Sequence, residues 1–182
     1  MRTSTRRADP YSGLGPVTAE PFFCDAGAGR LLRAGDLPLE VDLPGAPAEA
    51  EAAAAAAPPG KSRWATALER YFAGEPVVFD LDVDAYAAAH GLTAFERDVY
   101  AALARVPYGT VVSYRELAAA AGRPHAYRAA GSVMARNLLP VILPCHRVIR
   151  NDGRLGRYGD DPAWKGRLLA LEGVRVEEGR VA

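Results

Sequence analysis

Two helix starts in the second half of the chain constrain its fold more than any other feature. Thr93-Ala94-Phe95-Glu96 and Ser113-Tyr114-Arg115-Glu116 both have the capping-box pattern, in which the hydroxyl accepts from the third backbone amide and the glutamate reaches back to the cap. The pattern predicts a helix that begins at each segment. The first helix is expected to stop at the turn Pro107-Tyr108-Gly109, and the second to run through Ala121.

A third helix is expected over residues 126–137, after a break at Gly122-Arg123-Pro124. Two short helices joined by a turn that contains glycine form a helix-turn-helix, whose second member usually enters a DNA groove. The pattern is weak by itself, because helical hairpins that bind no DNA are commoner. It gains weight because arginines gather here, at positions 115, 123, 128 and 136.

The charge of the chain is zero overall but unevenly distributed. Residues 1–90 carry 8 Lys and Arg against 13 Asp and Glu, whereas residues 91–182 carry 14 against 9. Between residues 113 and 157, eight arginines face only Glu116 and Asp152. Such a basic region is either a surface that binds phosphates or a solvated arginine-rich face, and charge alone does not separate the two.

The first half of the chain has the pattern of a small α+β domain. Short strands are expected at residues 21–24, 29–32 and 39–43, a helix at 61–73, and a returning strand at 77–81. We therefore divide the chain into a flexible tail over 1–16, a scaffolding domain over 17–90 that includes an Ala/Pro-rich loop at 43–60, a mostly helical second domain over 91–175, and a tail over 176–182. The predicted fold class is α+β.

Composition narrows the setting of the protein. A hydrophobic content of 49% is ample for a packed core, and no run of eighteen or more apolar residues occurs. The charged N-terminus has no apolar segment behind it, so a soluble intracellular protein is expected. Two cysteines and three histidines without metal-ligand spacing argue against a disulfide framework, a structural metal and a metal cofactor.

The candidate chemistry centres on Cys145, which follows an apolar run, 141–143, that is expected to be a buried strand ended by Pro144. A free cysteine in apolar surroundings is more often inert than nucleophilic. Here an imidazole and a guanidinium come next in the sequence, at His146 and Arg147, and such neighbours raise the thiolate fraction.

Adjacent side chains on a strand point in different directions, so a bridging water is the natural link between the thiol and the imidazole of His146. Glu172, which we place with the helix 164–171, is the candidate acid that would orient this imidazole. An activated thiol beside basic helices fits a cysteine hydrolase, a redox sensor or a DNA-modifying protein.

The segment Leu143-Pro144-Cys145-His146-Arg147-Val148-Ile149 resembles the PCHRV signature of the O6-alkylguanine-DNA alkyltransferases, also called methylated-DNA-protein-cysteine methyltransferases. The resemblance is collinear over most of residues 93–173 and much looser in the first half. Further matching segments are Phe95 to Tyr100, Val106-Pro107-Tyr108-Gly109, Val112-Ser113-Tyr114, Tyr127 to Gly131, Lys165 to Leu169 and Glu172-Gly173.

The resemblance implies a protein that flips an O6-alkylguanine out of duplex DNA and takes the alkyl group irreversibly, in one turnover. It further implies a winged-helix-like helix-turn-helix in the second domain, no cofactor, a monomer, and a cytoplasmic location associated with the nucleoid. The implied catalytic residues are Cys145 as acceptor, His146 as water-mediated base, Glu172 as its partner and Tyr114 as donor to N3 of the leaving guanine. The implied DNA contacts are Arg128, Ser113, Arg115, Ala129 and Arg136, and the implied pocket and structural residues are Asn137, Val148, Tyr158 and Gly159.

Two departures from the family pattern bear on the site. Arg136-Asn137-Leu138 stands where the family usually has Gly-Asn-Pro, and Asp160-Asp161 stands where it has glycines. The acidic pair either slows DNA binding or alters which alkyl groups fit, or it simply faces solvent. The alternative functions are a lesion-binding protein without catalysis and a helix-turn-helix regulator, and Cys145 argues against the first because such relatives lack a nucleophile at that position.

Overall fold

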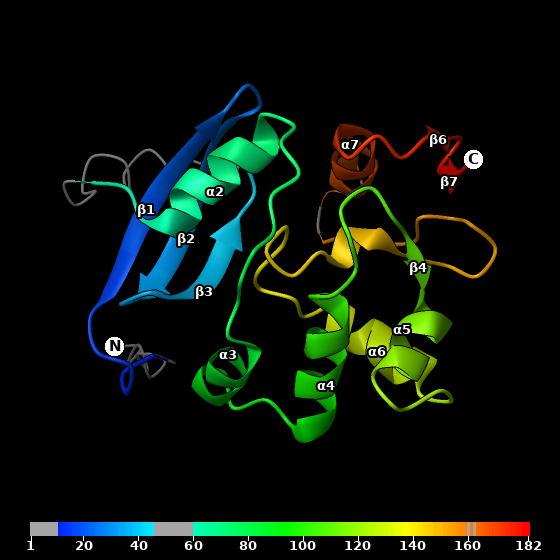
Figure 1. The fold of residues 1–182 in the computed structure, drawn as a ribbon, viewed down its shortest axis with the longest axis horizontal. Helices are drawn as coiled ribbons and strands as arrows, with labels where there is room; N and C mark the ends of the chain where they lie inside the picture. Colours follow the sequence, from blue (N-terminus) through cyan, green and yellow to red (C-terminus); the bar gives the residue numbers. More distant parts are fainter. Residues whose placement is uncertain (1–10, 46–59, 160, 162) are drawn as a thin grey trace, which may run out of the picture.

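A computed structural model of the chain describes residues 11–45, 60–159, 161 and 163–182. Its first sheet contains three antiparallel strands in the order β1-β2-β3, and their bounds are Val17–Cys24, Gly27–Ala34 and Leu37–Asp42. The strands predicted near residues 21–24, 29–32 and 39–43 are therefore confirmed, with the third ending one residue earlier than expected. They form one side of the molecule in Figure 1.

The helix predicted over 61–73 is α2, Arg63–Phe72, and it packs along this sheet (Figure 1). The hydroxyl of Ser62 caps it by accepting from the backbone amide of Ala65. Trp64, Leu68 and Tyr71 lie on the buried face of the helix. Tyr71 stands at the end of this face that approaches the second half of the chain.

The strand predicted over residues 77–81 is wrong. Val77 and Leu81 donate their backbone amides to Glu75 and Phe79, two residues earlier, so the segment bonds to itself in tight turns and joins no sheet. Val78 is 91% exposed. Val77, Phe79 and Leu81 pack on the core and alternate with exposed residues as in a strand, but no strand among the described residues pairs with the segment.

Helix α3, Val83–Ala89, was not expected from the sequence. Asp82 caps it by accepting from the backbone amide of Ala85, and the helix contacts both β3 and α4. Most buried apolar residues of both halves belong to one continuous cluster, and two smaller clusters lie beside it. The expected boundary at residues 90–91 falls in the turn between α3 and α4, and the division into two domains remains a prediction.

Both capping boxes are formed. Helix α4 spans Ala94–Leu103 behind Thr93, and helix α5 spans Tyr114–Ala120 behind Ser113. Helix α6 spans Tyr127–Met134, three residues shorter at its end than predicted, and packs against α5. The predicted pair of short basic helices is thereby confirmed (Figure 1).

Residues 141–143 are buried as expected, but the strand predicted there is wrong. Val141 has a φ of 75°, and the backbone amide of Leu143 donates to the carbonyl of Leu139, so the segment is a series of turns. Cys145 instead begins a single turn of 3₁₀ helix, η1, Cys145–Arg147. The strand follows it: β5, Val148–Ile149, pairs in parallel with β4, Val112–Ser113.

The chain closes with α7, Ala163–Leu171, and a small antiparallel hairpin of β6, Val176–Glu177, and β7, Arg180–Val181. The segment 176–182, predicted as a tail, contains this hairpin. The hairpin also bonds through its backbone to Gly153 and Leu155.

Tyr11, within the other predicted tail, is buried, and its hydroxyl donates to Glu40. Residues 1–10 of that tail and 46–59 of the predicted loop lie outside the described residues. In the described parts of the chain, every helix is too short or too polar to cross a membrane.

Candidate active site

Cys145 opens onto a cavity of about 880 Å³ that both halves of the chain line. The thiol residue is only 8% exposed, at the start of η1. Predicted site residues that share this cavity are Tyr114, Asn137, Tyr158 and Gly159. Residues 41–45, at the end of β3, form the wall from the first half.

Asn137 holds the segment that leads to the thiol. Its side-chain amide donates to Sγ of Cys145 at 3.0 Å and to the carbonyl of Leu143 at 2.8 Å, while its oxygen accepts from the backbone amide of Leu139 at 3.1 Å. One side chain thus replaces the strand hydrogen bonds that residues 139–143 do not make. The predicted structural role of Asn137 has a direct geometric basis.

The thiol is not activated in the way that the sequence suggested. Burial raises the pKa of Cys145, against the opposing effects of the Asn137 amide, the Lys165 ammonium and the Tyr158 hydroxyl. The guanidinium of Arg147, expected to help form the thiolate, points to Glu172 instead. Cys145 is therefore a neutral thiol at rest, and its reaction requires a base.

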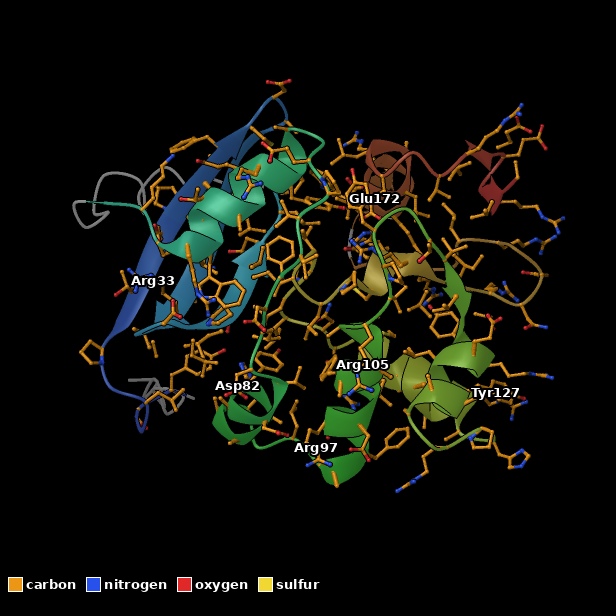
Figure 2. The ribbon with its side chains drawn as sticks, viewed as in Figure 1. Arg33, Asp82, Arg97, Arg105, Tyr127 and Glu172 are labelled. Carbon is orange, nitrogen blue, oxygen red and sulfur yellow. The ribbon has the colours of Figure 1, made fainter. Side chains whose placement is uncertain are left out.

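His146 and Glu172 form the predicted pair. Nε2 of His146 lies 2.7 Å from Oε1 of Glu172, and both side chains are fully buried. Glu172 follows the last residue of α7 and is labelled in Figure 2. Burial lowers the pKa of His146 more strongly than the neighbouring carboxylate raises it, so the imidazole is neutral near pH 7.

The carboxylate of Glu172 is surrounded by donors. Arg147 donates to both of its oxygens, with its terminal nitrogen 2.9 Å from Oε1 and Nε 3.0 Å from Oε2, and the backbone amide of Gly109 donates to Oε2 at 3.0 Å. Although burial raises the pKa of Glu172, the bonds from His146 and Arg147 outweigh it and hold the pKa at about 2. Glu172 is thus a permanent anion at neutral pH.

Gly109 has a structural reason to be glycine. Its φ is 72°, and a Cβ at this position would lie 3.1 Å from the carbonyl oxygen of Glu172. The absence of a side chain lets the backbone approach close enough to donate to the carboxylate. The segment Val106-Pro107-Tyr108-Gly109 further contributes the carbonyl of Val106, which accepts from Arg147 at 2.6 Å.

This network determines which imidazole nitrogen can act as a base. An ionised Glu172 only accepts hydrogen bonds, so Nε2 of His146 carries the proton. The other nitrogen, Nδ1, then has a free lone pair, and it is buried with no hydrogen-bond partner among the described residues. His146, the residue after Cys145 in the chain, therefore has an imidazole nitrogen that is free to accept a proton.

Lys165 is a buried cation next to the thiol. Its Nζ donates to the carbonyl of Val148 at 2.5 Å, and burial lowers its pKa to about 8. Tyr158 is also buried, and its hydroxyl has no partner of normal geometry in the described part of the chain, yet it is close enough for an anion at Cys145 to be stabilised by it. Both groups favour negative charge on the sulfur once it forms.

The predicted DNA contacts gather on helices α5 and α6, where Tyr127 is labelled in Figure 2. Arg128 and Ala129 are exposed, and the guanidinium groups of Arg115 and Arg128 each lie 5.8 Å from the ring centre of Tyr127. Ser113 is buried as the cap of α5. Arg136 forms an ion pair with Glu96 at 2.6 Å, so its charge is partly neutralised.

Val148 and the acidic pair were expected near the pocket. Val148 is fully buried in β5 and is absent from the described cavity lining, so its contribution is structural. Asp161 does line the cavity, and its side chain also accepts from the backbone amide of Ala163. Asp160 lies outside the described residues.

Sequence reasoning missed two groups that complete the site. Tyr71 lies in the helix predicted over 61–73, and no role in the site was predicted for it. Its hydroxyl donates to Glu172 at 2.7 Å. Lys165 belongs to one of the matching segments, but no role in the site was predicted for it. A lysine among the leucines of α7 is nevertheless a signal of a buried cation with a specific partner. No pattern in the sequence connects Tyr71 with Glu172, because 101 positions separate them.

The described residues contain no group of three or more His, Cys, Asp or Glu side chains placed to hold a metal ion. Cys24 is a free thiol at the end of β1.

Comparisons with known proteins agree with this site. Residues 94–174 match the family described as 6-O-methylguanine DNA methyltransferase, DNA binding domain. The methylated-DNA–protein-cysteine methyltransferase of Methanosarcina barkeri is 44% identical over 105 residues, which cover 58% of this chain and 63% of that protein. The chain spans less than two thirds of the length of this and two other curated relatives that it matches.

Solved structures extend the similarity to the first half. The crystal structure of the O6-methylguanine methyltransferase of Mycobacterium tuberculosis is 30% identical, with a TM-score of 0.67, over 90% of this chain and 96% of that one. A structure of the M. tuberculosis protein in complex with DNA matches at 30% identity and a TM-score of 0.67, over 86% and 93% of the two chains. The mixed α/β fold and the PCHRV segment agree with these comparisons. Because the similarity to the M. tuberculosis protein extends over 96% of that chain at 30% identity, the chain belongs to the O6-methylguanine DNA methyltransferase family.

Proposed function

We propose that this protein repairs DNA by transferring the alkyl group from O6-alkylguanine to its own Cys145. The observation that carries the proposal is the arrangement of the sulfur: it opens onto a cavity, Asn137 donates to it, and a neutral histidine with a free Nδ1 is its neighbour in the chain. The names of the relatives, which include methylated-DNA–protein-cysteine methyltransferase, support the same reaction.

The first step is loss of the thiol proton. Because burial raises the pKa of Cys145, the proton passes to Nδ1 of His146, through a bridging water, when the substrate is in place. The imidazolium that forms is stabilised by Glu172, 2.7 Å from Nε2. The new sulfur anion is stabilised by the Asn137 amide and by the positive charge of Lys165.

The second step is displacement at the alkyl carbon. Sγ forms a bond to this carbon, the bond between the carbon and O6 breaks, and the electron pair of that bond passes into the guanine ring. Tyr114, in the cavity wall, supplies a hydrogen bond or a proton to N3 and spreads the developing negative charge. The product thioether has no hydrolytic exit, so each chain reacts once, without a cofactor.

The substrate must reach a sulfur that is almost completely buried. A stacked base cannot do so, and the nucleotide therefore rotates out of the duplex into the cavity, at a cost of a few kcal/mol of stacking. Exposed Arg128, on α6, would fill the gap that the nucleotide leaves. Helices α5 and α6 would act as a winged helix-turn-helix that holds DNA mainly through phosphates, with Arg115, Ser113, Ala129 and Arg136 beside it.

We infer that the protein acts as a monomer on double-stranded DNA in the cytoplasm, where it associates with the nucleoid. The complex of the M. tuberculosis relative with DNA supports the choice of partner. The cavity wall at Tyr158 and Gly159 would close over the flipped base, next to the exposed Asp161.

The test is a mass measurement. Incubation with duplex DNA that contains O6-methylguanine should add the mass of one methyl group to the peptide that bears Cys145, to at most one group per chain. The Cys145→Ser variant should remain unmodified, and Cys24→Ser should react as the unchanged protein does, because Cys24 lies on β1 outside the cavity.

Two results would contradict the proposal. Methyl transfer by Cys145→Ser would assign the reaction to another residue. Tight binding of the damaged duplex with no added mass would support the alternative of a lesion-binding protein without catalysis.

A further inference from the structure

Tyr71 connects the first half of the chain to the proposed relay, by which we mean the proton path formed by Cys145, His146 and Glu172. It lies on α2, it is completely buried, and its hydroxyl lies 2.7 Å from Oε1 of Glu172 and 3.2 Å from Nε2 of His146. The ring also packs edge-on against the imidazole, with 6.3 Å between the ring centres. Tyr71 therefore contacts both partners of the acid and base pair.

The hydroxyl has one hydrogen, and the surroundings decide where it goes. An ionised carboxylate can only accept, so Tyr71 donates to Glu172. The phenolic oxygen is then left as an acceptor toward Nε2 of His146. Both oxygens next to Nε2 are acceptors, which fixes the imidazole proton there and leaves Nδ1 free.

The same bond reduces how strongly Glu172 stabilises a charged imidazole. Oε1 of Glu172 is shared by Tyr71, His146 and Arg147. Each donor withdraws some of the negative charge that a protonated His146 would otherwise use. Removing the hydroxyl should therefore strengthen the attraction between Glu172 and imidazolium and raise the pKa of His146.

A buried tyrosine can be satisfied without a side chain of the site. Tyr100, for example, donates to the backbone carbonyl of Val133. Tyr71 instead spends its only hydrogen on a side chain of the site, on an element far away in sequence. Ionisation of Tyr71 itself plays no part, because burial and the charge of Glu172 raise its pKa far above the neutral range.

We propose that Tyr71 is a positioning residue of the alkyl-transfer site: together with Glu172 it holds the proton of His146 at Nε2, and it keeps the imidazole uncharged until Cys145 releases its proton. This inference rests on the proposed function for its role in catalysis, but the placement of the proton can be tested without catalysis. It gives the first half of the chain a part in the reaction beyond scaffolding.

The pH dependence of the relay involves every charged group that faces it. Glu172 and Arg147 contact Tyr71 or His146 directly or through the shared carboxylate, Lys165 acts on the imidazole from α7, and Tyr108 packs against the Tyr71 ring at 6.0 Å between ring centres. Further groups that act on the same cluster are Tyr158 and Cys145. Removing the Tyr71 hydroxyl takes one donor from Glu172 and leaves every charged side chain of this cluster in the protein.

The experiment compares Tyr71→Phe with a matched control, Tyr86→Phe. Tyr86 is 1% exposed and lies on α3, where its ring packs against His90 and Tyr100. The rate of single-turnover methyl transfer from duplex DNA is measured from about pH 5 to about pH 9. This rate should fall on the acid side, because the reaction requires the unprotonated imidazole of His146 as its base. Tyr71→Phe should move the acid limb up by about half a unit to one unit, which slows transfer on the acid side by about three- to tenfold, and Tyr86→Phe should follow the unchanged protein.

Nitrogen-15 NMR of the histidine side chains provides a readout without DNA. The signals of His90, His125 and His146 are assigned with His90→Gln and His125→Gln variants. In the unchanged protein, His146 should be neutral and protonated at Nε2 at pH 7, and in Tyr71→Phe its titration should move to higher pH. Because phenylalanine keeps the ring that packs against the imidazole, the shift reports the loss of the hydroxyl.

The outcomes separate the two proposals. If the unchanged protein transfers no methyl group, the proposed function fails, while the NMR titration still decides the effect of Tyr71 on His146. If the unchanged protein is active and Tyr71→Phe keeps both the same acid limb and the same His146 titration, the inference about Tyr71 is overturned.

Discussion

The side-chain amide of Asn137 lies 3.0 Å from Sγ of Cys145 and donates to it. The same side chain bonds to the backbone of Leu139 and Leu143, the turns that lead to the sulfur. One residue thus both supports the backbone and lowers the cost of forming an anion on a buried thiol.

Asn137→Ala should raise the pKa of Cys145 further and slow its reaction. Losing a donor to a buried anion should reduce methyl transfer by about 10- to 100-fold, and the unbonded backbone groups should lower the free energy of unfolding by about 1–3 kcal/mol. The rate of iodoacetamide modification against pH measures the thiol, and urea unfolding measures stability. Asn151→Ala, at an exposed position, is the control and should change neither quantity. An unchanged iodoacetamide profile in Asn137→Ala would rule out the role of the amide.

Glu172 should make stability depend on pH in the acid range. Its pKa in the folded protein is about 2, below the ordinary value of 4.5, so the ionised carboxylate contributes stability above pH 4.5 that is lost as the pH falls toward 2. Glu172→Gln leaves Arg147 buried without its counter-ion and should lower the free energy of unfolding at pH 7 by about 3–5 kcal/mol.

The measurement is chemical unfolding at a series of pH values between about 2 and about 7. The difference between Glu172→Gln and the unchanged protein should shrink as the pH falls. Glu177→Gln removes an exposed carboxylate paired with Arg175 and should cost less than about 0.5 kcal/mol. A constant difference across the whole range would show that Glu172 is not held as an anion.

Arg128 and Arg115 should contribute to DNA binding in a salt-dependent way. Replacing either exposed arginine by alanine removes one positive charge from the proposed DNA-binding face and should lower the slope of log affinity against log salt by about 1. Arg136→Ala should have a smaller effect, because Glu96 already neutralises part of its charge. Arg63, which lies on α2 and pairs with Asp36, is the control position, and Arg63→Ala should leave the slope unchanged. Equal slopes for all four variants would place the DNA elsewhere.

Gly29 should be required for the packing of the first sheet. It faces Phe22 across β1 and β2, and a Cβ at this position would lie 2.1 Å from the tip of the Phe22 ring. Gly29→Ala should therefore lower the free energy of unfolding by about 1–3 kcal/mol through overpacking. Gly13→Ala, where a Cβ meets no atom within 4 Å, should be close to neutral. Thermal unfolding of both variants tests the difference, and a Gly29→Ala protein as stable as the original would contradict this packing.

Local signals in the sequence were sufficient for much of the fold. The two capping boxes predicted where α4 and α5 begin, because the interactions that start a helix lie within four residues. The same reasoning failed at residues 77–81 and 141–143, where an apolar run is equally compatible with a strand or with buried turns. For residues 139–143, the decision depended on Asn137, whose side chain supplies the hydrogen bonds that a neighbouring strand would have supplied.

The sequence by itself determined the candidate cysteine, histidine and acid of the site, since the PCHRV segment and Glu172 can be read directly from the order of residues. The tertiary structure alone decided their electrostatics. Burial makes the Cys145 thiol neutral, Arg147 turns to Glu172, and Tyr71 meets Glu172 from 101 positions away. These properties depend on which groups exclude water and which donors share an oxygen, and only packing of distant elements brings such groups together.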